Sequence, residues 1–287
     1  MADMKYVRAE TLEEAVAFLS THGLQTIILA GGTDVMVDVR SGELNKKILL
    51  DVSRLAALKK IEITDEGLCI GSGVTLTEIN TSPLIKKHAP ALQRCSCTFA
   101  SRQIRNIATV GGNVAHASPC GDTIPPLVIH EAQAVVANQD GQREISMDAI
   151  ASGAYHSCLA PGDLIVKFIL KPRKVGFADF QKIGRRKALA VSRMSMAVMA
   201  DKDETGNLSF IRFSLGACTP TPHRMDAVES FLMGQKPTHE RLLQAGEILA
   251  EKMVEITGRR ASIIYKEPAV QGLFMRILYP MVEWCAQ

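Results

Sequence analysis

The sequence predicts an α+β protein in which two units are followed by a C-terminal domain of antiparallel sheet and helices. In the first part of the chain, apolar stretches rich in β-branched residues lead to pairs of adjacent glycines, as strands do when they end at ligand-facing loops. After about residue 175, three strand-like stretches follow one another, and helical patterns then continue to the end. Runs of strands followed by runs of helices are typical of the α+β class.

Composition indicates an ordinary soluble globular protein. The 287 residues are 47% hydrophobic and 22% charged, and this length allows two or three domains. A net charge of +3 without a run of five like charges gives no indication of nucleic-acid binding. No apolar run approaches the roughly 18 to 20 residues of a membrane span, and the first residues lack the apolar core of a signal peptide. We therefore expect a cytoplasmic protein with no membrane span.

The cysteines give no indication of a metal site. The chain has seven, scattered and without a Cys-x-x-Cys pair, so neither a disulfide framework nor an iron–sulfur cluster is expected. Cys95 and Cys97 fall in a predicted helix, where residues two apart do not share a face.

The first unit, residues 1–55, has a β-α-β pattern. Thr11 followed by Glu14 predicts a capping box that opens a helix through Leu19. The apolar stretches 25–29 and 47–52 predict buried strands on either side of the first glycine pair.

The second unit, residues 56–174, mixes strands and helices. Strands are expected at 61–63 and 68–71, at 134–138 and 144–146 around an Asp-Gly turn, and at 163–170. Helices are expected at 75–80, at about 90–105 and at 124–131.

The last unit, residues 175–287, begins with strands at 177–183, 190–200 and 208–215. A turn at 203–207 joins the last two, which predicts antiparallel pairing. One helix that follows has a clear apolar face, formed by Leu242, Leu243, Ala245, Gly246, Ile248, Leu249 and Met253.

Two glycine loops, at 29–35 and 108–122, stand out as a candidate site. Adjacent glycines let the backbone approach a ligand, and the N–H groups of such loops can form a concavity that binds phosphate. Asp34 and Asp122 are suited to accept hydrogen bonds from ribose hydroxyls or a base edge. Neither loop matches the dinucleotide fingerprint G-x-G-x-x-G or the P-loop. Two loops of this kind predict one long ligand held from both sides.

The residues of these loops also resemble a known family. The stretches 30–34 (AGGTD), 103–113 (QIRNIATVGGN) and 117–125 (ASPCGDTIP) are similar to the FAD-binding subunit of the molybdenum hydroxylases, the xanthine dehydrogenase and carbon monoxide dehydrogenase family. The resemblance extends over the whole chain and is strongest to the separately encoded flavin subunits of bacterial xanthine dehydrogenases. It implies a two-part FAD-binding domain of the PCMH/VAO-like type (1–55 and 56–174) followed by a C-terminal flavoprotein domain (175–287).

The resemblance also implies which residues contact FAD. It places Phe99 near the flavin ring, Ile165 at a backbone contact to the isoalloxazine, and Lys182 in the region of a flavin-contacting lysine, where a slip of one residue would select Gln181. The full set of implied cofactor-binding residues is Ile27, Ile28, Leu29, Ala30, Gly31, Gly32, Thr33, Asp34, Phe99, Thr109, Val110, Gly111, Gly112, Asn113, His116, Ser118, Asp122, Ile165 and Lys182.

Structural roles are the alternative for several of these residues. Asp34 and Asp122 could cap helices, and Phe99 could be a core aromatic. The chain departs from many relatives at Lys187, where an acidic residue is common, and at His116, where a small hydroxyl or amide residue is common. His116 could contact the cofactor or fill space.

The implied function is that of an FAD-dependent oxidoreductase subunit. Non-covalent FAD would pass electrons from iron–sulfur clusters to NAD+ or another acceptor. The sequence shows no cluster ligands and no molybdenum-site motif, so the resemblance implies an iron–sulfur small subunit and a large molybdopterin subunit as partners. Two alternatives stay open: a stand-alone flavin-dependent NAD(P)H oxidoreductase, and a flavin-free scaffold subunit.

Overall fold

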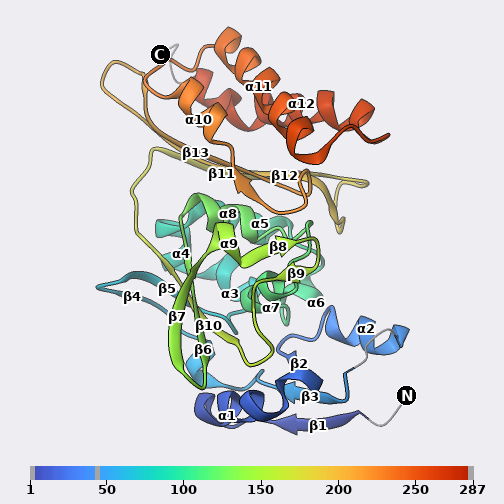
Figure 1. Ribbon diagram of the computed structural model, residues 1–287. Helices are drawn as coiled ribbons and strands as arrows, with labels where there is room; N and C mark the ends of the chain where they lie inside the picture. Colours follow the sequence, from blue (N-terminus) through green and yellow to red (C-terminus); the bar gives the residue numbers. More distant parts are fainter. Residues whose placement is uncertain (1–3, 43–45, 284–287) are drawn as a thin grey trace.

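Three bodies follow one another along the chain and are stacked in space. The computed structural model describes residues 4–42 and 46–283. The N-terminal body lies at one end, the second unit in the middle, and the C-terminal sheet and helices at the other end (Figure 1).

The first body is a parallel sheet with the strand order β1-β3-β2. Because all three strands are parallel, the carboxyl ends of β2 and β3 lie at the same edge of the sheet. Both strands predicted here are confirmed. The elements are β1 (Lys5–Arg8), α1 (Leu12–His22), β2 (Thr26–Leu29), α2 (Val35–Ser41) and β3 (Ile48–Asp51), with short 3-10 turns at Gly23–Gln25 and Ala56–Leu58.

Helix α1 begins at the predicted cap. The Thr11 hydroxyl accepts the Glu14 N–H at 3.1 Å, but the Glu14 carboxylate accepts the N–H of Glu10 rather than that of Thr11. Ala15 and Leu19 face the core, and the helix continues three residues beyond the predicted end.

The second unit is built on an antiparallel sheet with the order β4-β5-β10-β6-β7. All predicted strands are present, and the predicted turn at Asp140-Gly141 joins β6 to β7. The strands are β4 (Ile61–Thr64), β5 (Gly67–Gly71), β6 (Gln133–Asn138), β7 (Gly141–Ser146) and β10 (Leu164–Leu170), with a separate pair β8 (Ala151–Gly153) and β9 (His156–Ser157). The helices are α3 (Leu76–Thr81), α4 (Pro83–His88), α5 (Pro90–Thr98), α6 (Arg102–Arg105), α7 (Val110–Ala115), α8 (Ile124–Ile129) and α9 (Met147–Ile150).

The long helix predicted at about 90–105 is wrong in its second half. The chain leaves the helix at Phe99, turns through Ala100 with a φ of 35°, and starts α6 after Ser101. Ser101 caps α6 by accepting the Ile104 N–H, and the Arg105 guanidinium holds the turn through the Phe99 carbonyl at 2.7 Å. No glycine or proline marks this break, so the apolar pattern alone predicted an uninterrupted helix.

The C-terminal domain is a second antiparallel sheet, with the order β11-β12-β13-β14. Three helices, α10, α11 and α12, cover one face of this sheet. The predicted strands and the predicted turn at 203–207 are confirmed. The elements are β11 (Phe177–Gly184), β12 (Ser192–Lys202), β13 (Leu208–Gly216), β14 (His223–Arg224), α10 (Asp226–Leu232), α11 (His239–Thr257) and α12 (Ile263–Glu283).

The three bodies share apolar contacts. Leu50 of the first sheet packs in one cluster with Leu164 and Val166 of β10, so the first unit is not an isolated core. On the other side, Ile129 of α8 packs against Ala197 of the C-terminal sheet. We keep the division at 55/56 and 174/175 as a proposal.

A buried histidine lies where α8 meets the C-terminal sheet. His130 is almost completely buried, and burial, helped by the nearby Arg212 charge, lowers its pKa to about 4. Neither of its ring nitrogens has a hydrogen-bond partner within the described residues. The imidazole is therefore neutral at pH 7 and serves as packing between the two bodies.

Within residues 4–42 and 46–283, no helix combines the length and the hydropathy that a membrane crossing needs.

Candidate functional site

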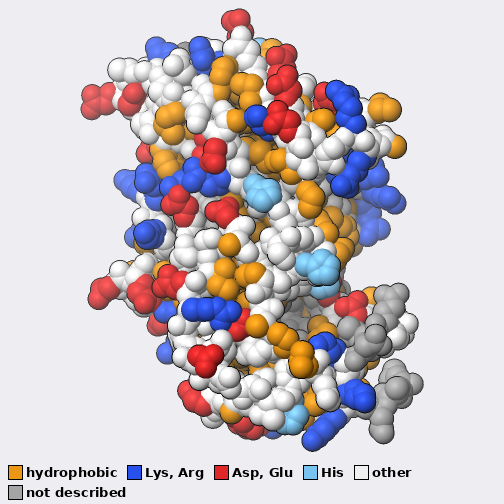
Figure 2. Space-filling view, viewed as in Figure 1, with side chains coloured by type: hydrophobic (Ala, Val, Ile, Leu, Met, Phe, Trp, Pro, Cys, Tyr) orange, Lys and Arg blue, Asp and Glu red, His pale blue; other side chains and the backbone are white. Residues whose placement is uncertain are grey.

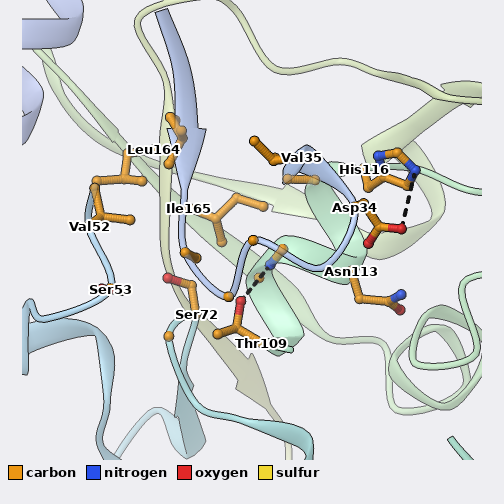
Figure 3. A pocket seen from close by; sticks show the side chains of 18 of the residues that line it. Asp34, Val35, Val52, Ser53, Ser72, Thr109, Asn113, His116, Leu164 and Ile165 are labelled. Atoms are coloured by element: carbon orange, nitrogen blue, oxygen red, sulfur yellow. Dashed lines mark hydrogen bonds and ion pairs between the residues drawn. The ribbon is translucent and has the colours of Figure 1, made fainter. Parts of the chain in front are cut away.

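A cavity of about 710 Å³ opens between the first sheet and the second unit. It lies where β2 and β3 end, and it is closed on the other side by α7 and by β10 (Figure 3). Ligands of parallel sheets bind beyond the carboxyl ends of the strands, which is the position of this cavity. Of the predicted site residues, those that line it are Ile27, Ile28, Ala30, Gly31, Gly32, Thr33, Asp34, Phe99, Thr109, Gly111, Gly112, Asn113, His116 and Ile165.

The first glycine loop presents its backbone to the cavity. In the described part of the chain, the N–H groups of residues 31–35 donate to no protein acceptor, although the next N–H, that of Met36, donates to the Gly32 carbonyl. Five successive free donors beside a cavity form an anion-binding surface. A row of N–H groups without protein partners is suited to a ligand that accepts hydrogen bonds.

Both glycines of this loop are required by its geometry. A Cβ on Gly31 would lie 2.0 Å from the carbonyl oxygen of Ile107, so the first loop touches the start of the second loop with no side chain between them. Gly32 has a φ of 70°, in the left-handed region that glycine adopts without strain.

The second glycine pair is not in a loop, which corrects the prediction. Gly111 and Gly112 lie inside the short helix α7, whose cap is Thr109. The Gly111 N–H donates to the Ser72 carbonyl at 2.8 Å, and the Gly112 N–H donates to the Thr109 hydroxyl at 3.1 Å. These donors are already used within the protein. Gly111 is needed for packing instead, because a Cβ there would meet Ser72 at 2.5 Å.

Two side chains connect the loops across the cavity. His116 Nε2 lies 4.0 Å from an Asp34 carboxylate oxygen, as the dashed line in Figure 3 shows. The ring of Tyr155 packs edge-on against the His116 ring, with 5.3 Å between the ring centres. Asp34 occupies the cap position of α2, as the structural alternative predicts, but its side chain makes no cap bond to the helix.

The far wall of the cavity is mostly apolar and carries one buried carboxylate. Ile165, Leu164 and Val52 supply the apolar surface. Burial would raise the pKa of Asp163, but hydrogen bonds from the Arg143 guanidinium and the Ala160 N–H more than offset it and hold that pKa below its usual value. Asp163 is therefore charged and fully engaged by protein groups.

Five predicted site residues do not line the cavity. The Val110 side chain is in the core, Leu29 is half-buried at the end of β2, and the Ser118 hydroxyl accepts the Cys120 N–H. The other two, Asp122 and Lys182, form an ion pair of 2.6 Å whose side chains are 6% and 11% exposed.

The Asp122–Lys182 pair joins the second unit to the C-terminal domain. The other carboxylate oxygen of Asp122 accepts the Ser192 hydroxyl at 2.5 Å, and Lys182 also donates to the Ala190 carbonyl at 3.3 Å. Asp122 does not cap α8, whose cap position is Thr123. Beside it, burial raises the pKa of the Cys95 thiol well above its usual value, and the Asp122 charge adds to the effect.

Sequence reasoning missed part of the cavity wall. Ser72 and Gly73 come from the end of β5, and Ser53 follows β3. Lys46 and Lys59 bring positive charge to the lining. The Gly-Ser-Gly stretch at 71–73, where the apolar strand 67–71 ends, is the sequence signal that indicates Ser72 and Gly73.

No group of three or more potential metal ligands is found among the described residues.

Comparisons with known proteins identify the family. A family described as the FAD binding domain in molybdopterin dehydrogenase matches residues 2–172, and the CO dehydrogenase flavoprotein C-terminal domain matches residues 179–281.

Proteins that match this chain along nearly its whole length are named as subunits of dehydrogenases. The chain is 26% identical to a nicotinate dehydrogenase FAD-subunit of Eubacterium barkeri, over 99% of this chain and 97% of that protein. It is 28% identical to a putative xanthine dehydrogenase FAD-binding subunit of Escherichia coli, over 95% and 94%. It is 26% identical to the carbon monoxide dehydrogenase medium chain of Hydrogenophaga pseudoflava, over 98% of each.

Solved structures share the fold. A chain of the carbon monoxide dehydrogenase from Hydrogenophaga pseudoflava superposes with a TM-score of 0.89 at 24% identity, covering 96% of both chains. A chain of quinoline 2-oxidoreductase from Pseudomonas putida 86 gives a TM-score of 0.90 at 20% identity, covering 99% of this chain and 98% of that one. The resemblance and the fold class predicted from the sequence are confirmed, and the chain belongs to the family of FAD-binding subunits of the molybdenum hydroxylases.

Proposed function

We propose that this chain is the electron-relay subunit of a molybdenum hydroxylase complex and that FAD binds non-covalently in the cavity beside the first glycine loop. The observation that carries the proposal is the row of five free backbone N–H groups at residues 31–35. A pyrophosphate offers enough oxygen acceptors to pair with such a row.

The residues of the cavity fit the other parts of a flavin dinucleotide. The Asn113 carboxamide oxygen is taken by the Thr123 hydroxyl at 2.6 Å, which leaves its NH₂ group available to a ligand. Ile165 and Val52 offer an apolar wall to a flat ring, and Phe99 lies at the same cavity. A volume of about 710 Å³ is within the range of about 300 to 1,000 Å³ that is usual for small-molecule sites.

The remaining predicted contacts receive different roles in this proposal. Asp122 and Lys182 support the site, because their nearly buried ion pair holds the C-terminal domain against the stretch that follows α7. Ser118 shapes the turn after α7, and Leu29 and Val110 contribute through packing and backbone position.

FAD, when bound, supplies exchange of one or two electrons and so links one-electron carriers to two-electron acceptors. The chain's own residues bind and orient it, and they exclude water from its apolar side. We propose that electrons arrive from iron–sulfur clusters on a small partner subunit, that a large molybdopterin subunit carries out the hydroxylation, and that NAD+ or another acceptor takes the electrons in the cytoplasm. The relatives named as FAD-subunits and medium chains support this arrangement.

An absorbance spectrum with mass identification of co-purifying chains tests the proposal. We expect about one FAD per chain, released by denaturation, and two further subunits in the purified complex. A colourless chain that takes up no added FAD would leave the flavin-free scaffold as the better description. A yellow chain that purifies alone and oxidises NAD(P)H would instead favour the stand-alone oxidoreductase.

A further inference from the structure

A strongly basic surface lies on the C-terminal domain, outside the cavity. It consists of the turn from β11 to β12, residues 184–193, and the connection from α11 into α12, residues 258–265. Neither stretch contains an acidic residue. The cations of this basic surface are all exposed: Arg185, Arg186, Lys187, Arg193, Arg259 and Arg260.

The two stretches form one surface. The Arg193 guanidinium carbon lies 5.5 Å from the centre of the Tyr265 ring, which joins the start of β12 to the start of α12. Both stretches lie on the right-hand side of the upper domain in Figure 1, and basic and hydrophobic side chains gather along that side in Figure 2. Within the described residues, none of the six cations forms an ion pair. Their charge is therefore available to a partner.

Large apolar side chains are exposed among these cations. Ile264 is 85% exposed and Val191 is 74% exposed, with Leu189 and Tyr265 about half exposed beside them. Grouped apolar side chains with a polar rim mark interaction sites more often than scattered ones do.

The turn that presents them is fixed in shape. Leu189 has a φ of 54°, which a non-glycine residue adopts only where its surroundings hold it. The Arg186 guanidinium stabilises this conformation, because its Nε–H donates to the carbonyl oxygen of Leu189 at a distance of 3.0 Å.

The base of the basic surface is attached to the wall of the candidate cofactor site. Lys182 and Ser192, on either side of the turn, both bind the Asp122 carboxylate, and Lys182 also binds the Ala190 carbonyl. Asp122 is followed by Thr123, whose hydroxyl donates to the carboxamide oxygen of Asn113 at 2.6 Å, and Asn113 lines the cavity. A short chain of contacts, from Lys182 and Ser192 through Asp122 and Thr123 to Asn113, therefore connects this surface to the cofactor site.

We propose that this basic surface docks a small acidic electron-carrier protein that exchanges electrons with the bound cofactor. This inference rests on the proposed electron-relay function. The six cations without ion pairs outnumber the four exposed large apolar side chains of the surface, which suits a transient, electrostatically steered redox encounter. Permanent subunit interfaces are larger and more apolar. The carrier is recognised by acidic side chains that surround its exposed redox group.

The test measures binding of a plant-type [2Fe–2S] ferredoxin, an acidic carrier, to the FAD-loaded chain by calorimetry. The variant reverses two charges of the surface, Arg185→Glu with Lys187→Glu, and leaves Arg186 to hold the turn. The matched control, Lys86→Glu with Lys87→Glu, makes the same change in charge at two exposed lysines of α4. We expect the Kd for ferredoxin to rise about tenfold or more in the surface variant and less than about twofold in the control.

Two further measurements, the salt dependence of ferredoxin binding and the rate of FAD reduction, complete the test. Raising the salt from about 20 mM to about 200 mM should weaken ferredoxin binding to the unchanged chain and to the control, with little further effect on the surface variant. The rate at which reduced ferredoxin reduces the chain's FAD, two ferredoxins each giving one electron while two protons come from water, should fall in the surface variant by a similar factor.

Equal ferredoxin affinity in all three proteins would overturn the proposal. So would binding of phosphatidylserine-containing vesicles through the same residues without binding of ferredoxin, because the surface would then be a membrane contact. The FAD content of the chain tests the proposed function separately. A chain that binds no FAD would contradict the proposed function, whatever its affinity for ferredoxin.

Discussion

The two glycine pairs look alike in the sequence and serve different purposes in the fold. Residues 31–35 line the cavity and their backbone N–H groups donate to no acceptor among the described residues, whereas the N–H groups of Gly111 and Gly112 are bonded to Ser72 and Thr109. The first pair therefore offers donors to a ligand. The second pair allows a helix to pack closely on the end of β5, and so forms a firm wall opposite the first.

The comparison teaches that an adjacent glycine pair indicates close approach, but not what approaches. At Gly31 a neighbouring carbonyl comes so near that a Cβ would be 2.0 Å from it, and at Gly111 the neighbour is Ser72. Hydrogen-bond accounting of each N–H separates the ligand-facing loop from the packed one.

The largest effect is expected from Gly31→Val. The new side chain would collide with the Ile107 carbonyl and push the first loop away from α7, which would remove the geometry of the free N–H row. We expect the Kd for FAD, measured by quenching of flavin fluorescence, to rise at least about 100-fold, or about 2.7 kcal/mol.

The control for this variant is Gly272→Ala, in α12, where a Cβ would meet nothing within 4 Å. It should bind FAD as the unchanged chain does. Normal FAD binding by Gly31→Val would show that contact between the two loops is not needed for the site.

A smaller and different effect is expected from Gly111→Ala. Its Cβ would meet Ser72 at 2.5 Å, so the cost is overpacking of about 1 to 3 kcal/mol in stability. A thermal melt should show a lower Tm, while the FAD affinity of the folded fraction changes by less than about threefold. Lost FAD affinity with an unchanged Tm would mean that the second pair, like the first, contacts the ligand.

The smallest effect is expected from Asp34→Asn, which removes the charge that faces His116. The two side chains are 4.0 Å apart and partly exposed, and such pairs contribute about 0 to 1 kcal/mol. The Kd for FAD should therefore change by no more than about fivefold. His116→Asn should give a similar change, and the double variant should add little to either one. A loss as large as that of Gly31→Val would make Asp34 a principal ligand of FAD.

Much of the fold could be predicted because strand and turn signals are local. The strand before Gly31, the Asp140-Gly141 turn and the three strands of the C-terminal domain all follow apolar patterns and turn residues that are close in sequence. The break after Thr98 could not be predicted. It depends on the Arg105 guanidinium reaching back to the Phe99 carbonyl, and not on a helix-breaking residue.

The site was predictable in its loops and less so in its walls. The first glycine loop lines the cavity, but Ser72 and Ser53 reach it only because separate strands end at the same place. The partners of Asp122 were also hidden from the sequence, since Lys182 and Ser192 lie 60 and 70 residues away and meet it only when the C-terminal sheet packs on α8.

The central claim is that the first glycine loop, and not the second pair, gives its N–H groups to FAD. Selective ¹⁵N-glycine labelling followed by FAD titration tests it most directly, because Gly31, Gly32, Gly111 and Gly112 then report in one spectrum, with assignment by single substitutions. The account predicts the largest amide shifts at Gly31 and Gly32, with smaller ones at Gly111 and Gly112. Stoichiometric FAD binding that moves the Gly111 and Gly112 signals and leaves Gly31 and Gly32 unchanged would contradict it.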